Sequence, residues 1–119
     1  MHPPTTSDEG GVLVITFDDP AGLNDGRSDA FRQSIYELVQ TRPQPKIAAD
    51  LSPVDYLSSS GLAALVGLKR RVDAQQGRLV LFQLHPYVHD VLRVTKLTQY
   101  FVITSDRASA IASLAAQPA

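Results

Sequence analysis

The chain has 119 residues, which is enough for one domain with a modest core and short for two. Hydrophobic residues make up 44% of it and charged residues 19%, the balance of a folded domain and not of a disordered segment. The net charge of −1 gives no electrostatic case for binding nucleic acid or an acidic membrane. Because there is no cysteine, disulfides, thiolate zinc sites and cysteine nucleophiles are excluded.

Both ends of the chain are predicted to lie outside the folded domain. Residues 1–11 are polar and rich in helix and strand breakers, without the basic and apolar regions of a signal peptide, and are interpreted as a flexible leader. The end of the chain predicts a frayed tail over 116–119, which leaves one domain over 12–115. No apolar stretch is long enough to span a bilayer, so we expect a soluble, cytoplasmic protein without membrane insertion.

The first half of the chain predicts two buried strands and one helix. "VLVITF", residues 12–17, is apolar on both faces, as a strand covered on both sides should be. The loop "DDPAGLND" after it has room for one very short strand around Leu23. "KIAADL", residues 46–51, predicts the second buried strand. Between them a helix is predicted from Ser28 to the prolines at 43 and 45, because its apolar residues share one helical face: Phe31, Ile35, Leu38 and Val39.

The second half predicts a regular alternation of helix and strand. The segment "SSGLAALVGLKRRVDAQQ" is expected to be helical and to stop at Gly77 as a left-handed residue. Strands are predicted over 78–84 and 100–104, with a helix starting at Pro86 between them and a last helix capped by Ser105 and Asp106. Strand–helix–strand units favour parallel pairing. The predicted class is therefore α/β: a single small domain with a mixed, mostly parallel sheet of four to five strands and about four helices.

The serine run Ser58–Ser60 lies where the helix after the second buried strand begins. One interpretation is capping, in which a serine hydroxyl accepts a hydrogen bond from a free backbone N–H and contributes about 1 kcal/mol. The other is regulation, because the free N–H groups of a helix N-terminus favour an anion. A phosphate added there brings roughly −1.5 to −2 charges and converts the first turn into a switch for a partner protein. The residues alone leave both interpretations open.

A resemblance to a known family covers residues 12–114. "DLSPVDY" followed by "SSSGL" resembles the STAS domain, the fold of bacterial anti-sigma-factor antagonists. "VLVITF", "GLNDGRSDAFRQSI" and the stretch from "GRLVLF" to "SDRASAIASL" resemble the family's first strand, first turn with helix, and second half. In that family a partner kinase phosphorylates the first serine after an aspartate. The resemblance places this position at Ser59 here, with Ser58 and Ser60 as alternatives.

Two positions depart from the family's pattern. Where the family has a carboxylate just before the phosphorylated serine, this chain has Ser58. Where the family has an acidic residue in the first turn, this chain has Asn24, with Asp25 one place later. Fewer carboxylates would repel a phosphate less. If those carboxylates position the kinase's magnesium, however, phosphorylation would be slow or absent.

The function implied by the resemblance is that of a bacterial signalling protein in transcription regulation, a binding module and not an enzyme. Unphosphorylated, it would dock on an anti-sigma factor that is also an ATP-supplying serine protein kinase, and phosphate on Ser59 would break that contact. No cofactor is expected in the chain itself. The helix also carries small residues outside the apolar stripe that faces the core, and Gly67 among them is interpreted as allowing close approach by a partner. The predicted contact surface comprises Asn24, Asp25, Ser58, Ser59, Ser60, Gly61, Ala63, Ala64 and Gly67.

Other functions compete with this one. STAS-like domains also serve as subunits of transport or stress-sensing complexes, and the missing acid before Ser59 fits such a non-phosphorylated role. The sequence has no Gly-x-Ser-x-Gly elbow, and no histidine is placed to pair with the serine run. No catalytic residue is therefore predicted. His85 and His89 have no third ligand at suitable spacing, so no metal site is expected. The basic residues 69–71 are interpreted as a solvated helix face.

Overall fold

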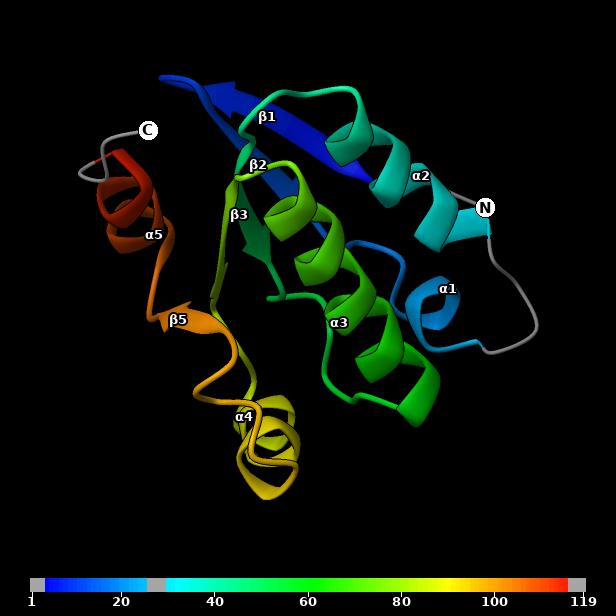
Figure 1. Cartoon of the computed structure of the whole chain (residues 1–119). Helices are drawn as coiled ribbons and strands as arrows, with labels where there is room; N and C mark the ends of the chain where they lie inside the picture. Colours follow the sequence, from blue (N-terminus) through cyan, green and yellow to red (C-terminus); the bar gives the residue numbers. More distant parts are fainter. Residues whose placement is uncertain (1–3, 26–29, 116–119) are drawn as a thin grey trace.

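A five-stranded sheet forms the centre of the computed structural model, which describes residues 4–25 and 30–115 (Figure 1). The strands follow one another across the sheet in chain order: β1 (Thr5–Glu9), β2 (Val12–Thr16), β3 (Lys46–Asp50), β4 (Arg78–Phe82) and β5 (Val102–Thr104). β1 pairs antiparallel with β2, and every other neighbouring pair is parallel. The predicted α/β class with a mixed, mostly parallel sheet is confirmed.

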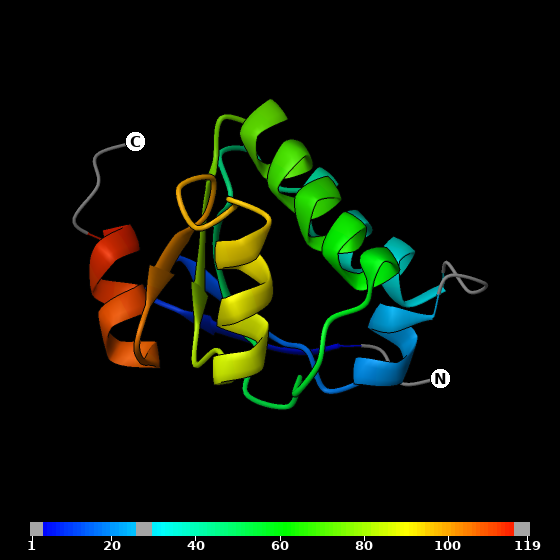
Figure 2. The same cartoon turned by 90° about the horizontal axis from the view of Figure 1, so that it is seen from below.

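Helices cover both faces of the sheet, in unequal numbers. They are α1 (Pro20–Asn24), α2 (Ala30–Gln40), α3 (Ser59–Ala74), α4 (Pro86–Val94) and α5 (Arg107–Ala115). Figure 2 shows α5 alone on one side of the strands, with the other helices on the opposite side. The larger core cluster lies between the sheet and α1 to α4, and the smaller one lies between the sheet and α5.

The residues of β2 show why the central residues of the predicted strands are apolar. Leu13 and Ile15 belong to the larger core cluster, whereas Val12 and Val14 belong to the cluster under α5. Successive side chains of a strand point to opposite faces, so a strand covered on both sides buries all of them. All four are at most 3% exposed, which confirms the prediction of a strand covered on both sides.

The leader predicted over residues 1–11 is wrong for residues 5–9, which form β1. This strand pairs with β2 from Thr5 opposite Thr16 to Glu9 opposite Val12. Gly10 and Gly11 connect the two strands with φ angles of 63° and 88°, the left-handed backbone that a tight two-residue hairpin turn requires. The domain thus begins before residue 12. The strand escaped detection because its side chains are polar and mostly exposed. The tail predicted over 116–119 lies outside the described residues.

The segment around Leu23, interpreted as a loop with room for one very short strand, forms the helix α1 instead. Asp19 caps it by accepting a hydrogen bond from the Gly22 N–H at 3.0 Å. Pro20 occupies the first turn, where its fixed φ and missing N–H cost nothing. Leu23 is fully buried in the larger core. The predicted start of the next helix at Ser28 lies outside the described residues.

The end of α3 corrects the role assigned to Gly77. The left-handed residue is Gln76, with φ of 59°. Gln76 N–H donates to Asp73 O and Gly77 N–H donates to Val72 O, each at 2.9 Å, the pair of bonds that closes a helix in a Schellman motif. Glycine is needed at 77 for a different reason: a Cβ there would lie 2.2 Å from the Pro45 carbonyl oxygen.

We predict that Gly77→Ala lowers the free energy of unfolding by about 1–3 kcal/mol, because backbone must shift to admit the methyl group. Gln76→Gly is the matched control and should raise it by about 1 kcal/mol, since glycine adopts the left-handed conformation without strain. Urea denaturation measures both. A neutral Gly77→Ala variant would contradict the account of this turn.

A second prediction concerns Glu9, which joins β1 to α5. Arg107 donates to the Glu9 carboxylate through Nε at 2.9 Å and through Nη2, and this contact lowers the pKa of Glu9. A lowered native pKa stabilises the fold above the unfolded value and is lost as pH falls through the native one. Glu9→Gln should therefore lower the thermal midpoint at pH 7, with the difference shrinking as pH falls below the ordinary glutamate pKa and through the lowered native one.

Asp8→Asn is the control for Glu9→Gln. Asp8 lies in the same strand, but its contact with Arg42 is a looser, exposed one at 3.7 Å. Exposed ion pairs of this kind contribute little to stability, so the midpoint should change less. A deficit in Glu9→Gln that stays constant from pH 7 to pH 3 would rule out the carboxylate–guanidinium contact as its cause.

Candidate functional site

Ser58 is the residue that caps α3. Its backbone is extended, with φ of −80° and ψ of 171°, and its Oγ accepts a hydrogen bond from the Gly61 N–H at 3.1 Å. The Ser58 carbonyl also accepts the first helical bond, from Leu62 N–H at 2.9 Å. Capping therefore accounts for one serine of the run. No hydrogen bond from the hydroxyl of Ser59 or Ser60 to another described residue is needed at this helix end.

The capping serine is bound to Asn24, the last residue of α1. Ser58 N–H donates to Asn24 Oδ1 at 2.7 Å, and Ser58 Oγ lies 2.9 Å from the Asn24 carbonyl and 3.0 Å from Oδ1. Asn24 Nδ2 donates to the carbonyls of Pro20 at 3.0 Å and Tyr56 at 3.2 Å. Asn24 is only 8% exposed, and both ends of its amide are satisfied. The two residues that depart from the family's pattern thus contact each other.

Ser59 is the first residue of α3 and is exposed. Its hydroxyl has no hydrogen-bond partner within the part of the chain that the structure describes. The N–H groups of Ser59 and Ser60 belong to the first turn, where a helix offers no acceptor. An exposed hydroxyl thus stands next to free backbone donors at the positive end of a helix dipole. This arrangement suits a phosphate ester.

Three of the residues predicted to form the contact surface lie against the chain's own elements instead. Gly61 is buried, and a Cβ there would come 2.1 Å from Asn24 Oδ1. Ala64 is 5% exposed, and its carbonyl accepts the Tyr36 hydroxyl at 3.1 Å. At Gly67 a Cβ would meet the same hydroxyl at 2.5 Å. Gly67 therefore permits close approach by α2 and not by a partner. Gly67 and Ala64 were assigned to the exposed contact surface, and the structure corrects both assignments.

The accessible predicted residues Ser59, Ser60 and Ala63, together with Tyr56, which the sequence did not indicate, are called the Ser59 surface below. Tyr56 is 45% exposed, Ser59 and Ala63 are exposed and Ser60 is half-buried. Asp25, half-buried, follows Asn24 along the chain. Asn24 and Ser58 thus form a supporting pair, and the Ser59 surface is the part that a partner can reach.

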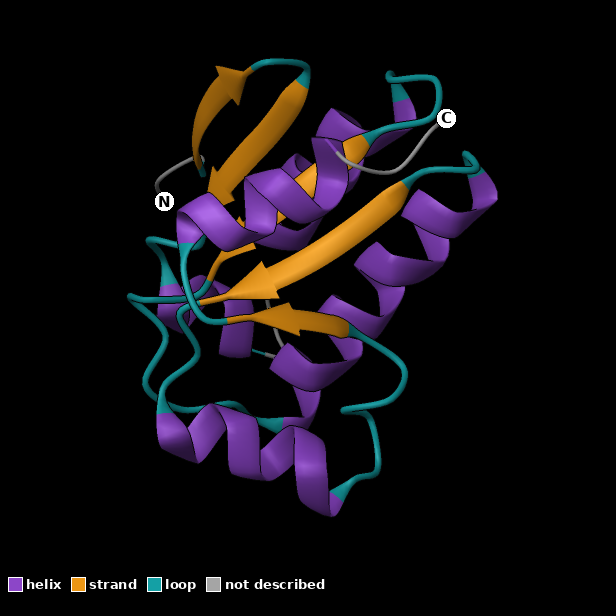
Figure 3. Ribbon diagram, turned by 90° about the vertical axis from the view of Figure 1, so that its left-hand side faces the viewer, coloured by secondary structure: helices purple, strands orange, loops and turns teal. Residues whose placement is uncertain are grey.

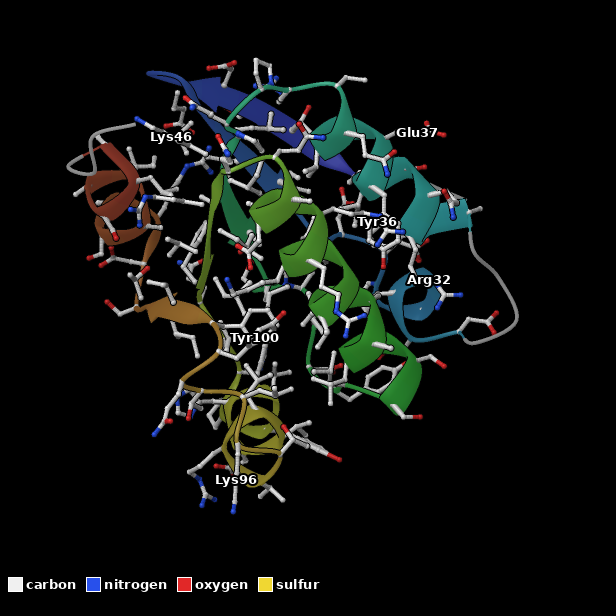
Figure 4. The ribbon with its side chains drawn as sticks, viewed as in Figure 1. Arg32, Tyr36, Glu37, Lys46, Lys96 and Tyr100 are labelled. Atoms are coloured by element: carbon white, nitrogen blue, oxygen red, sulfur yellow. The ribbon has the colours of Figure 1, made fainter. Side chains whose placement is uncertain are left out.

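The basic residues of α3 also differ from the solvated face that was expected. Lys69 Nζ bonds both carboxylate oxygens of Asp73, at 3.0 and 3.1 Å, and lies 5.1 Å from the centre of the Tyr100 ring. Arg71 stacks on the Tyr36 ring at 3.7 Å, and Figure 4 shows that tyrosine between α2 and α3. Only Arg70 is exposed. Two of these cations thus hold elements of the fold together.

The described residues contain no cluster of three potential metal ligands among His, Cys, Asp and Glu. His85 caps α4 by position and its Nε2 lies 3.0 Å from the Ser52 carbonyl. Over the same residues, no helix has the length and apolar character needed to cross a membrane.

Comparison with known proteins points to one family. The model of the STAS domain matches residues 4–110. BtrV of Bordetella bronchiseptica, named as a candidate anti-sigma factor antagonist, is 31% identical over 68 residues, which cover 57% of this chain and 59% of BtrV. The anti-sigma F factor antagonist of Paenibacillus polymyxa is 25% identical over 104 residues, 87% of each chain.

Solved structures agree on the fold. An anti-sigma-factor antagonist (STAS) domain protein from Planctomyces limnophilus superposes with a TM-score of 0.84 at 23% identity, over 97% of this chain and 100% of that one. The Bacillus cell fate determinant SpoIIAA in its phosphorylated form superposes with a TM-score of 0.66 at 19% identity, over 92% and 97% of the two chains.

We predict that Asn24→Asp lowers the free energy of unfolding by about 1–3 kcal/mol at pH 7, because it places a carboxylate oxygen against two carbonyls in a buried site. Burial raises the pKa of such a carboxyl, and the protonated form can donate again. The deficit should therefore shrink as pH falls from 7 to 4, as measured by urea denaturation. Gln33→Glu, an exposed change of the same kind on α2, should be near neutral. A deficit independent of pH would contradict the role given to Asn24.

Proposed function

Because this chain belongs to the STAS domain family, we propose that it is an anti-sigma-factor antagonist acting by phosphorylation-controlled partner switching. In the unphosphorylated form it docks through the Ser59 surface on an anti-sigma factor that is also a serine kinase, and frees a sigma factor. The partner supplies ATP in the cytoplasm, and phosphate on Ser59 ends the contact. The observation that carries this proposal is an exposed Ser59 hydroxyl next to a helix cap made by a different serine.

The division of labour between Ser58 and Ser59 supports the proposal. Ser58 satisfies the helix end and is held by Asn24, so the fold does not use the Ser59 hydroxyl. A phosphate on Ser59 therefore removes no hydrogen bond of the fold. It gains free N–H donors in the first turn and the favourable end of the dipole. The modified chain should stay folded while its surface changes.

The charge near Ser59 supports a switch that acts on docking. The contacting pair Asn24 and Ser58 is neutral, so no carboxylate of that pair repels a phosphate. The exposed Tyr56 ring and the small side chain of Ala63 suit close packing by a partner. Burying a phosphate of roughly −1.5 to −2 charges under such a partner carries a large desolvation cost. Docking and phosphorylation should thus exclude each other.

The relatives support a protein partner. Those with similar sequences are named as antagonists of anti-sigma factors, and the phosphorylated form of SpoIIAA has the same fold. A second candidate function is a non-phosphorylated STAS subunit of a transport or stress-sensing complex. The neutral Asn24–Ser58 pair favours it, because it lacks the two carboxylates of the family's pattern. Co-purification of a kinase-like anti-sigma factor, as opposed to a transporter ATPase, separates the two functions.

We expect the purified cognate anti-sigma factor with ATP to phosphorylate the chain on Ser59, detected by peptide mass spectrometry. Phosphate should persist in Ser60→Ala and vanish in Ser59→Ala. With a kinase that binds the chain and consumes ATP, absence of phosphate from Ser58, Ser59 and Ser60 alike would sink the proposed modification and favour the second candidate.

We further expect Ser59→Asp to lose the dominant partner in an affinity pull-down, while Ser59→Ala retains it. Ala108→Asp is the matched control, because it adds the same charge to an exposed first-turn position of α5. It should bind like the wild type. Equal loss in Ala108→Asp would attribute the effect to net charge and not to the Ser59 surface.

A further inference from the structure

A second site lies at the other end of the sheet from Ser59. A cavity of about 430 Å³ opens where β3 and β4 begin, between the ends of α3 and α5. Figure 1 shows these helix ends in the upper half of the molecule, whereas α3 begins in its lower half. Along α3, Ser59 and the cavity residue Asp73 are separated by about 21 Å. The volume is that of pockets that hold small molecules.

The cavity exists because one helix cannot cover its face of the sheet. Among the helices of the described residues, only α5 contributes to the core cluster on this face. A helix is about 10 Å wide, whereas five strands span about 19 Å. In Figure 3, seen from the side of α5, the strands of the β5 edge remain in view beside that helix. Val102 of β5 is accordingly 51% exposed and lines the cavity with Val80 and Leu114.

Two cations that have no acidic partner among the described residues stand at the rim. Lys46 and Arg78 are the first residues of β3 and β4 and are partners in the register, so their side chains point to the same face. That face is the one under α5, because Ala48 and Val80, two residues further on, pack there. Within the described residues neither cation has an ion pair, and the nearby Asp73 is engaged by Lys69. Like charges placed opposite each other are unfavourable until an anion joins them.

Two exposed glutamines stand at the same cavity. Gln44 and Gln76 line it, and both have left-handed backbones, with φ of 47° and 59°. Such backbones cost free energy in residues other than glycine and persist only where neighbours hold them. Here Gln44 N–H donates to Gln75 O at 3.1 Å and Arg78 N–H donates to Pro45 O at 2.8 Å. The turns that carry both amides are thus tied together.

We propose that this cavity binds a small amphipathic anion. A carboxylate or phosphate head lies between Lys46 and Arg78 with the glutamine amides as further donors, and a short apolar tail lies on Val80 and Val102. This site goes beyond the partner-switching function and shares no residue with the Ser59 surface. Binding there needs neither the kinase nor phosphorylation.

The test is a titration of the full chain by two-dimensional amide NMR with octanoate and with octyl phosphate, each below its micelle concentration. Saturable shifts should appear at residues that line the cavity, with either head group. Octyl glucoside, which has the same tail without charge, and inorganic phosphate, which has no tail, should each bind at least about tenfold more weakly. The stronger of the two anions identifies the source of the head group.

Variants assign the head group to its cations. Lys46→Gln combined with Arg78→Gln should weaken binding at least about tenfold, since each removes a charged hydrogen bond. Lys96→Gln is the matched control, because Lys96 is exposed and lies far from Lys46 in Figure 4. Thermal melts establish that each variant is folded. The proposal is overturned if neither anion gives saturable shifts, if octyl glucoside binds as well, or if Lys96→Gln weakens binding equally.

Discussion

The contact between Asn24 and Ser58 is the constraint on which the candidate site depends. It joins the end of α1 to the start of α3 across 34 positions of sequence. Through it, the capping task at the start of α3 falls to Ser58, and the next hydroxyl is left in solvent. A modification at Ser59 can therefore change what the surface binds without changing the fold of the domain. A reversible switch requires that the residue that is modified differs from the residue that stabilises the fold.

The same helix carries two sites with different physical bases. Its first turn presents free N–H donors around Ser59, where a covalent phosphate would act on a protein partner. Its last turn ends beside the cavity at Lys46 and Arg78, where charge and apolar surface favour a small amphipathic anion. Between them, Tyr36 and Arg71 pack α3 against α2, with Gly67 permitting the close approach. This packed middle part of α3 separates the Ser59 surface from the cavity.

The sequence predicted most of the sheet and the exposure of Ser59, and the reasons are physical. The buried strands have apolar central residues and a helix end needs only one cap, so both leave local patterns. Contacts between distant residues leave none: nothing in the sequence indicated that Asn24 binds Ser58 or that Gly67 faces Tyr36. The polar strand β1 lacked an apolar face to reveal it. At Gly77 the usual rule failed because the nearby Pro45 carbonyl, and not a left-handed backbone, requires glycine.

The most direct test of the central claim is the amide NMR spectrum of the chain phosphorylated on Ser59, compared with that of the unmodified chain. If the Asn24–Ser58 contact carries the support, shifts should be confined to the first turn of α3 and the Tyr56 loop, with the remaining amides unchanged. Shifts spreading through α1 and the core strands would contradict the account, because they would show that the Ser59 hydroxyl is part of what holds the fold together.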